Sequence, residues 1–324
     1  MRGKQMKGII FGLALAVCAL AALAGAQTAV PRQIKIVVPF SAGASNDAIA
    51  RAIAAQMADE LKAVVIVENR VGAAGVIGSE YVAKSPRDGA TLLLTSSTFL
   101  TAAAVQPQMP YDPVESFAPV AMVGQGPLVV AVSGATPYAD LKGLLEDARA
   151  KPQALNYGTA GIGSLAHLAT VMMNDAAKVS MTHVPYKGAA NAASDLAGGQ
   201  IDIMLANYSS LLSLVQSGKV KLLATTARSA SQAFPKLPPA ASVVPGYAMD
   251  IWVGVFAPAG TPRDLVDRYN AAINRISRTP QTTALLDMDG TVPASLTSAE
   301  FGRRVADDYA QWRAVAQSHR IGIE

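Results

Sequence analysis

Residues 36–57 of the chain read "IVVPFSAGASNDAIARAIAAQM". A β-branched run ends at Pro39, and a loop of small, mostly polar residues follows it. Apolar residues then recur every four positions, at Ile49, Ile53 and Met57. A continuous apolar run is typical of a buried parallel strand, and a four-residue spacing is typical of one face of a helix. The stretch therefore predicts a strand, a loop and a helix, which begin a βαβ unit.

The same alternation continues on both sides of this stretch. Strand patterns at 64–67 and 91–94 enclose a helical pattern at 76–83, and residues 128–225 repeat strand and helix patterns. Right-handed helical crossovers of this kind give parallel sheets. The sequence therefore predicts an α/β protein with two lobes, each a mainly parallel sheet flanked by helices. The expected division is 27–127 plus 226–324 for one lobe and 128–225 for the other, after a leader at 1–26.

The leader has the pattern of a secretory signal peptide. Basic residues precede an apolar run at 9–23, and small residues follow it, so we expect a cut after Ala26, with Ala24 as the alternative. The run is short for a membrane span. Cys18 is preceded by a valine and not by a small residue, which argues against a lipid anchor. The product is expected in the periplasm.

Composition narrows the function classes. The leader carries three of the 27 Lys and Arg, which leaves 24 against 23 acids, so the predicted mature chain has no basic surplus for nucleic acid. Its one cysteine also lies in the leader, so no disulfide framework is expected. We expect a monomeric globular protein without nucleic-acid partners.

The first small-residue loop is a candidate anion site. It follows a strand and opens a helix, where backbone N–H groups and the positive end of the helix dipole favour negative charge. Ser41, Ser45 and Asn46 add side-chain donors. The alternative is ordinary helix capping, because Ser, Asn and Asp are preferred at helix starts generally.

A second loop of the same kind lies in the other predicted lobe, in "NYGTAGIGSLAHL", residues 156–168. Gly161 and Gly163 free the backbone to approach a ligand, Ser164 offers a hydroxyl, and His167 lies one turn further on. Two such helix starts in opposite lobes predict a clamshell that closes on a small anion. Neither loop contains a lysine or an arginine, which favours a carboxylate over phosphate.

Motifs for other chemistries are weak. "VGAAGVIG" at 71–78 has G-x-x-G-x-x-G spacing, so we interpret its glycines as close helix packing and expect no cofactor. There is no G-x-S-x-G, and the three histidines show no metal-ligand spacing. Asp47 could act as a general base, but an acid in a first helical turn is stabilised there in any case. A hydrolase using Ser164, His167 and Asp47 stays open as an alternative, as does a protein-binding module.

The chain resembles the receptors of the tripartite tricarboxylate transporters, the Bug-type periplasmic solute receptors. The resemblance rests on segments that span nearly the whole predicted mature chain, among them "PFSAGASNDAIAR", "VVIVENRVGAAGVIGSEYVAKSPRDGATLLL", "NYGTAGIGSLAHL", "THVPYKGAANAASDLAGGQIDIML" and "WVGVFAPAGTP". The first loop departs from the usual proline and double glycine of the family, with Ser41, Ala42 and Ala44 at these positions.

The resemblance implies a two-lobed Venus-flytrap fold of type II character that binds an organic carboxylate between its lobes. The two loops would hold the carboxylate, partly through water, and the closed form would be presented to a membrane permease or a sensor. The candidate ligand contacts are Phe40, Ser41, Ala42, Gly43, Ser45, Asn46, Asp47, Ser97, Thr98, Thr159, Gly161, Gly163, Ser164, His167 and Asn207.

Overall fold

A computed structural model describes residues 28–106 and 108–322 of the chain. The predicted leader, residues 1–26, lies outside these described residues. Within the described ranges, no helix is both long enough and apolar enough to cross a membrane.

The first lobe is built on a six-stranded sheet with strand order β11-β4-β10-β3-β1-β2. Strand β1 pairs in parallel with β2 and β3, whereas β10 pairs antiparallel with β3 and β4, and β11 antiparallel with β4. The strands are β1 (Gln33–Val38), β2 (Val64–Asn69), β3 (Thr91–Ser96), β4 (Phe117–Pro127), β10 (Asp250–Pro258) and β11 (Val292–Pro293).

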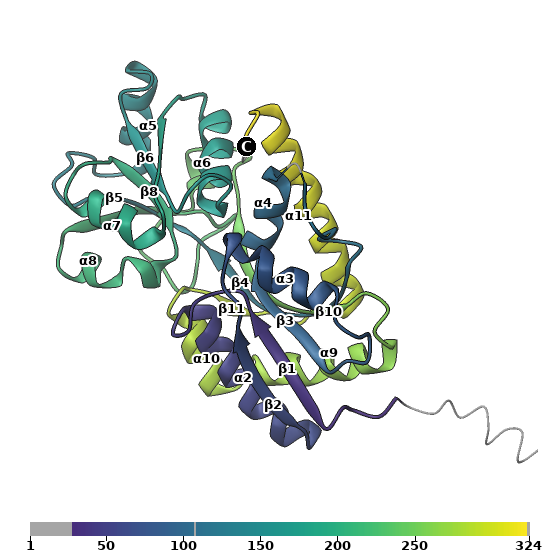
Figure 1. The fold of residues 1–324 in the computed structure, drawn as a ribbon. Helices are drawn as coiled ribbons and strands as arrows, with labels where there is room; N and C mark the ends of the chain where they lie inside the picture. Colours follow the sequence, from purple (N-terminus) through teal and green to yellow (C-terminus); the bar gives the residue numbers. More distant parts are fainter. Residues whose placement is uncertain (1–27, 107, 323–324) are drawn as a thin grey trace, which may run out of the picture.

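The second lobe is built on a five-stranded sheet with strand order β7-β6-β8-β5-β9. Strand β6 pairs in parallel with β7 and β8, and β5 pairs antiparallel with β8 and β9. Figure 1 shows the two sheets as separate halves of the molecule. The strands are β5 (Val129–Ser133), β6 (Asn156–Thr159), β7 (Thr182–Pro185), β8 (Ile203–Ala206) and β9 (Val220–Thr225).

Both sheets are mixed, but most of their strands run in one direction: β1 to β4 in the first sheet and β6 to β9 in the second, with β10 and β11 or β5 reversed. The prediction of a two-lobed α/β fold with mainly parallel sheets is therefore confirmed. Parallel pairs arise where a helix carries the chain back within one sheet. The chain instead passes straight from β4 into β5, and from β9 it goes to β10, so these strands connect the two sheets. In each sheet a strand on such a connection, β10 or β5, lies antiparallel between two neighbours.

Helices cover both faces of the first sheet. The alternation along β1 sends Ile34, Ile36 and Val38 to one face and Val37 to the other. The first face packs against α2 and α9, and the second against α3, α4 and α11 (Figure 1). These helices are α2 (Ser45–Leu61), α3 (Val76–Ala83), α4 (Thr98–Val105), α9 (Arg263–Ile276) and α11 (Ser298–Ser318).

The predicted stripe of the first helix is confirmed, because Ile49, Ile53 and Met57 are buried in the core between α2 and the sheet. The remaining helices are α5 (Leu141–Ala150), α6 (Leu165–Ala177), α7 (Ala189–Ala197) and α8 (Leu212–Gln216) in the second lobe and α10 (Pro280–Asp287) in the first. Short 3₁₀ turns lie at η1 (Ala73–Gly75), η2 (Tyr208–Ser210) and η3 (Ala240–Ser242).

Thr226 ties the two chain crossings together. It is fully buried, and its hydroxyl accepts from the Leu128 N–H at 2.9 Å and donates to the Met249 carbonyl at 2.7 Å. Its backbone N–H donates to the Leu128 carbonyl at 2.9 Å. Because Leu128 follows β4 and Met249 precedes β10, this one side chain holds together the two segments that cross between the lobes.

The last helix touches both lobes. Helix α11 packs along the first lobe, but its end lies beside α6 of the second lobe (Figure 1). There His319 Nε2 lies 2.7 Å from Asp175 Oδ2, and Gln311 Nε2 lies 3.8 Å from Met172 Sδ. The two lobes are therefore in contact through α11 and α6 as well as through the crossing segments.

Candidate functional site

The first loop is folded around Asp47. Gly43 adopts a left-handed φ of 82°, and its N–H donates to Asp47 Oδ2 at 2.8 Å. Asn69 Nδ2 donates to Asp47 Oδ1 at 2.8 Å, and Arg51 Nε to Oδ2 at 3.0 Å. Burial raises the pKa of Asp47, but these hydrogen bonds outweigh it and hold the pKa at about 2. Asp47 is an ionised group that shapes the loop.

Capping by a side chain does not explain this loop. The residue that precedes α2 is Ala44, and it makes no side-chain hydrogen bond to the first turn. The loop tip, Ser41 to Gly43, is exposed. The first turn of α2 thus begins without the Ser, Thr, Asp or Asn cap that most helices use.

In the second loop, capping and ligand access occur together. Ser164 precedes α6, and its Oγ accepts from the His167 N–H at 3.3 Å. The hydroxyl hydrogen of Ser164 remains available to an acceptor. Gly161 and Gly163 have φ of 123° and 77°, as the loop requires. A Cβ on Gly163 would come within 2.4 Å of Val105 Cγ2, so this loop also packs closely against α4 of the first lobe.

Two histidines that are distant in sequence stack beneath the second loop. The rings of His167 and His183 lie 3.8 Å apart with an interplanar angle of 12°, and Tyr157 stacks on His183 at 4.9 Å. His167 Nδ1 accepts from the Gly163 N–H at 3.2 Å, and His183 Nε2 lies 2.7 Å from Thr159 Oγ1. Burial lowers the pKa of each histidine to about 4. Both histidines are neutral at physiological pH, and they support the second loop through their contacts with Gly163 and Thr159.

A pocket between the lobes gathers candidate residues from both sides. It has a volume of about 130 Å³ and is lined by Thr98 of the first lobe and by Ser164 and Asn207 of the second. Ala166 and Ser210 also line it. The pocket therefore presents three hydroxyls and an amide, together with the first turn of α6, to a ligand that enters it.

A smaller pocket of about 40 Å³ adjoins the first one. Ser45 and Asn46 of the first loop line it, together with Asp289, and it shares Asn207 and Ile251 with the larger pocket. The two loops therefore contribute to adjoining cavities of one interlobe cleft. Asp289 was missed by sequence reasoning, because it lies in a turn after α10 that carries no helix-start signal.

The other candidate residues line neither pocket. Ser97 is buried beside Thr98, and its Oγ has no hydrogen-bond partner among the described residues. The rest belong to the loops or to their supports and are Phe40, Ser41, Ala42, Gly43, Asp47, Thr159, Gly161, Gly163 and His167.

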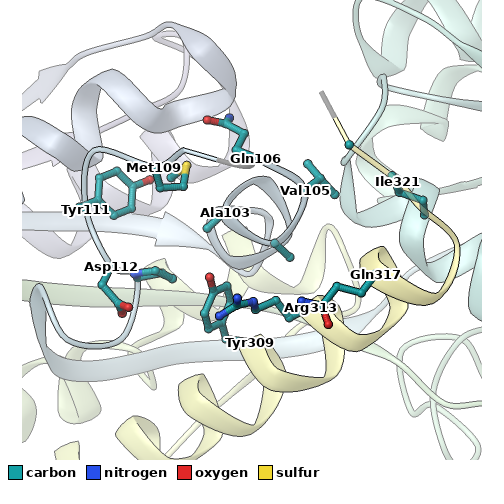
Figure 2. Close-up of a pocket in the computed structure, with 13 residues that line it drawn as sticks. Ala103, Val105, Gln106, Met109, Tyr111, Asp112, Tyr309, Arg313, Gln317 and Ile321 are labelled. Carbon is teal, nitrogen blue, oxygen red and sulfur yellow. The ribbon is translucent and has the colours of Figure 1, made fainter. Parts of the chain in front are cut away.

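A larger pocket lies elsewhere, between α4 and the second half of α11. It has a volume of about 610 Å³, and Figure 2 shows Tyr309 and Arg313 of α11 together with Ala103 of α4 and Asp112 of the following loop. None of the candidate ligand contacts lines it. It is at the C-terminal end of α4, where the helix dipole opposes anion binding.

The geometry gives no support to a hydrolase. The Ser164 hydroxyl meets the backbone of His167 and not its ring, while His167 Nδ1 is engaged by Gly163. Asp47 lies in the other lobe, and its carboxylate is held by Gly43, Arg51 and Asn69. The hydroxyl, the imidazole and the carboxylate are therefore not hydrogen-bonded to one another, as a nucleophile, its base and an orienting acid would have to be.

The glycines at 71–78 serve packing, as predicted. A Cβ on Gly78 would lie 2.7 Å from the Arg70 carbonyl and 3.0 Å from Pro39 Cβ, and one on Gly75 would lie 3.4 Å from Pro39 Cβ. These contacts bring α3 against the end of β1. Among residues 28–106 and 108–322, no group of three or more His, Cys, Asp or Glu side chains is placed to hold a metal ion.

Comparison with known proteins agrees with this geometry. The chain is 34% identical over 316 residues to the "UPF0065 protein in tcbD-tcbE intergenic region" of a Pseudomonas species, which covers 97% of this chain and 94% of the relative. It is also similar to the solved structure "R. palustris Rpa4515 with adipate", with a TM-score of 0.79, 32% identity and coverage of 90% of this chain and 98% of that one.

A second similar structure is MatC from Rhodopseudomonas palustris with bound malate, with a TM-score of 0.75, 30% identity and coverage of 88% of this chain and 98% of that one. The profile of the tripartite tricarboxylate transporter family receptor matches residues 49–321. With a match over most of its length and two lobes that meet at a cleft, the chain belongs to the family of tripartite tricarboxylate transporter receptors.

Proposed function

We propose that this protein is an extracytoplasmic solute receptor that captures a small organic carboxylate between its lobes and carries out no chemistry on it. The observation that carries the proposal is the pocket lined across both lobes by Thr98, Ser164 and Asn207. Similar proteins of known structure hold adipate and malate, which are both carboxylates.

Neutral donors in this pocket suit a carboxylate. The hydroxyls of Thr98 and Ser164 and the amide of Asn207 can each donate to an anionic oxygen, and such charge-assisted hydrogen bonds are stronger than neutral ones. The first turn of α6 adds the positive end of a helix dipole. Ordered water can complete the coordination.

The lobes would move as two bodies about the crossing at Leu128 and Thr226, with residues 27–127 plus 226–324 in one and 128–225 in the other. Residues 1–26 would direct export to the periplasm. The closed, liganded monomer would then be read by a membrane permease or by a sensor. No cofactor is needed for this cycle.

The test is binding of a carboxylate panel to protein spanning residues 27–324, measured by thermal shift and calorimetry, with Ser164→Ala as the variant. We expect some carboxylates to bind, while phosphate and sugars do not. Ser164→Ala should weaken that binding about tenfold or more, since a charge-assisted hydrogen bond contributes roughly 1.5–3 kcal/mol.

The matched control is Thr297→Ala, which removes the cap of α11 far from the cleft. Both variants lose a helix cap and should lose about 1 kcal/mol of stability. Only Ser164→Ala should lose affinity. If folded wild-type protein bound no carboxylate, or if Ser164→Ala bound as well as Thr297→Ala, the proposed site would be wrong.

A further inference from the structure

Asp289 is a carboxylate placed inside the interlobe cleft. It lies in the turn after α10, which is fixed by hydrogen bonds of 3.0 Å from the Asp289 and Thr291 N–H groups to the Leu286 carbonyl and by Gly290 at a left-handed φ of 64°. Asp289 is 5% exposed and lines the smaller pocket beside Ser45 and Asn207. The backbone therefore holds this acid at the boundary between the lobes.

Its hydrogen-bond partners come from both lobes. Ser45 Oγ of the first lobe and Asn207 Nδ2 of the second each donate to Asp289 Oδ2 at 3.3 Å. The backbone N–H of Ser209 donates to Oδ1 at 2.9 Å. A carboxylate has about four acceptor positions, and two of these three bonds are long. Asp289 can therefore accept a further, stronger donor.

No cation balances this charge. Within residues 28–106 and 108–322, none of the ion pairs includes Asp289, and all three of its donors are neutral. The other buried acid of the cleft region, Asp47, is paired with Arg51. A buried carboxylate without a counter-ion is costly, and a cation that reaches it is correspondingly favoured.

We propose that Asp289 selects ligands by their charge, so that this receptor binds amino-acid-type ligands, which have a carboxylate and a protonated amine. This inference rests on the proposed function, since the ligand's carboxylate would meet Ser164 and Thr98 in the larger pocket. The amine would replace the Asn207 amide in front of Asp289, because Asn207 lines both pockets and its amide donates to Asp289 Oδ2 at 3.3 Å. A second carboxylate at that end would be repelled by Asp289 at short range.

The experiment compares ligands matched in length that differ only in one end group. The probes are succinate with 4-aminobutyrate, glutarate with 5-aminopentanoate, and adipate with 6-aminohexanoate, each measured by calorimetry on the wild type and on Asp289→Asn. Asn keeps the size and an acceptor oxygen of Asp while removing the charge. Asp287→Asn is the matched control, because this exposed acid lies two residues away and outside both pockets.

The wild type and Asp287→Asn should prefer the amino acid over its matched dicarboxylate by about tenfold or more, which is about 1.4 kcal/mol or more of like-charge repulsion avoided. In Asp289→Asn this preference should vanish or reverse, chiefly because the dicarboxylate binds more tightly. A purely structural role for Asp289 would change both affinities together and leave their ratio untouched.

Two results would overturn the inference in distinguishable ways. Binding with the same preference ratio in all three proteins would remove the role of Asp289 and leave the carboxylate receptor intact. Lack of binding of every probe and every acid of the wider panel, in folded protein, would overturn the proposed function and this inference with it.

Discussion

Asp47 and Gly43 show how single residues set the first loop. The Asp47 carboxylate accepts hydrogen bonds from the loop, from α2 and from β2, so one buried group joins three segments. Gly43 supplies both the N–H and the left-handed turn that this arrangement needs. The loop is thus prepared by the protein's own contacts before any ligand arrives.

Asp47→Asn should lower the free energy of unfolding at pH 7 by about 1–3 kcal/mol, because the folded-state pKa of about 2 lies below that of an unfolded Asp, which is 3.8. A carboxyl group whose pKa is lower in the folded state stabilises the fold at pH values above its unfolded pKa. This contribution is lost as pH falls from about 4 towards 2. Urea unfolding at pH 7 and pH 3 measures it. Asp267→Asn is the control, since Asp267 forms an exposed pair with Arg263, and equal losses in both variants would contradict the prediction.

Gly43→Val should weaken carboxylate binding more than it lowers stability. No atom lies within 4 Å of a Cβ built on Gly43, so the cost is backbone strain of about 1–2 kcal/mol, which distorts the loop. Gly246→Val is a close control, because Gly246 has φ of 83° and the same open space outside the cleft pockets. Thermal unfolding should show similar losses of stability in both variants, whereas calorimetry should show a loss of affinity of about tenfold in Gly43→Val alone. Equal affinities in the two variants would refute the loop's role in binding.

At the scale of elements, strand, loop and helix repeat in both lobes and present helix N-termini to one cleft. The alternation of β-branched runs and apolar stripes was sufficient to predict the βαβ units, because each depends on residues close in sequence. The antiparallel strands β5 and β10 were not predictable in this way, since their partners are set by the passage of the chain between sheets.

Ser164 was predicted from its place at a helix start, and it lines one pocket together with Thr98 and Asn207. The stacked pair of His167 and His183 and the buried Asp289 could not be predicted in this way, because their neighbours lie far away in the chain. Sequence periodicity says which face of an element is apolar, but not which distant polar group will face it.

The histidine stack predicts that the second lobe weakens in mild acid. Burial lowers the folded-state pKa of both His167 and His183 to about 4, against 6.5 for an unfolded histidine. The unfolded chain therefore binds more protons between these values, and stability should fall as pH drops from about 6.5 towards 4. His167→Asn, which retains an acceptor for Gly163, should show a shallower slope in unfolding experiments from pH 7.5 to 4.5.

His319→Gln serves as the comparison for this slope. His319 is an exposed histidine at the end of α11, outside the stack. Its replacement should leave the acid-induced loss of stability close to that of the wild type. If His167→Asn and His319→Gln followed the same curve as the wild type, the stacked pair would not be the source of the pH dependence.

For the whole molecule, the crossing at Leu128 and Thr226 decides how the lobes are related. Thr226→Val removes the hydroxyl that joins Leu128 to Met249, so the buried Leu128 N–H and the Met249 carbonyl each lose a hydrogen-bond partner. We expect the free energy of unfolding to fall by about 1–3 kcal/mol. Thr226→Ser keeps the hydroxyl and should restore most of the hinge contacts.

Small-angle scattering of the two variants without ligand tests the hinge itself. The valine variant should show a larger radius of gyration and a broader distance distribution than the serine variant, because the two crossing segments are no longer held together. Identical scattering profiles, with only stability changed, would show that Thr226 supports the fold without restraining the lobes.

The end of α11 beside α6 makes this receptor suited to optical sensing. Because that helix is packed on the first lobe while its final turn touches the second, a hinge motion would change the surroundings of an attached probe there without the probe entering the cleft. The predicted mature chain has no cysteine of its own, so Ser318→Cys would offer one thiol for an environment-sensitive dye. The dye's emission would then report the concentration of the bound solute in real time.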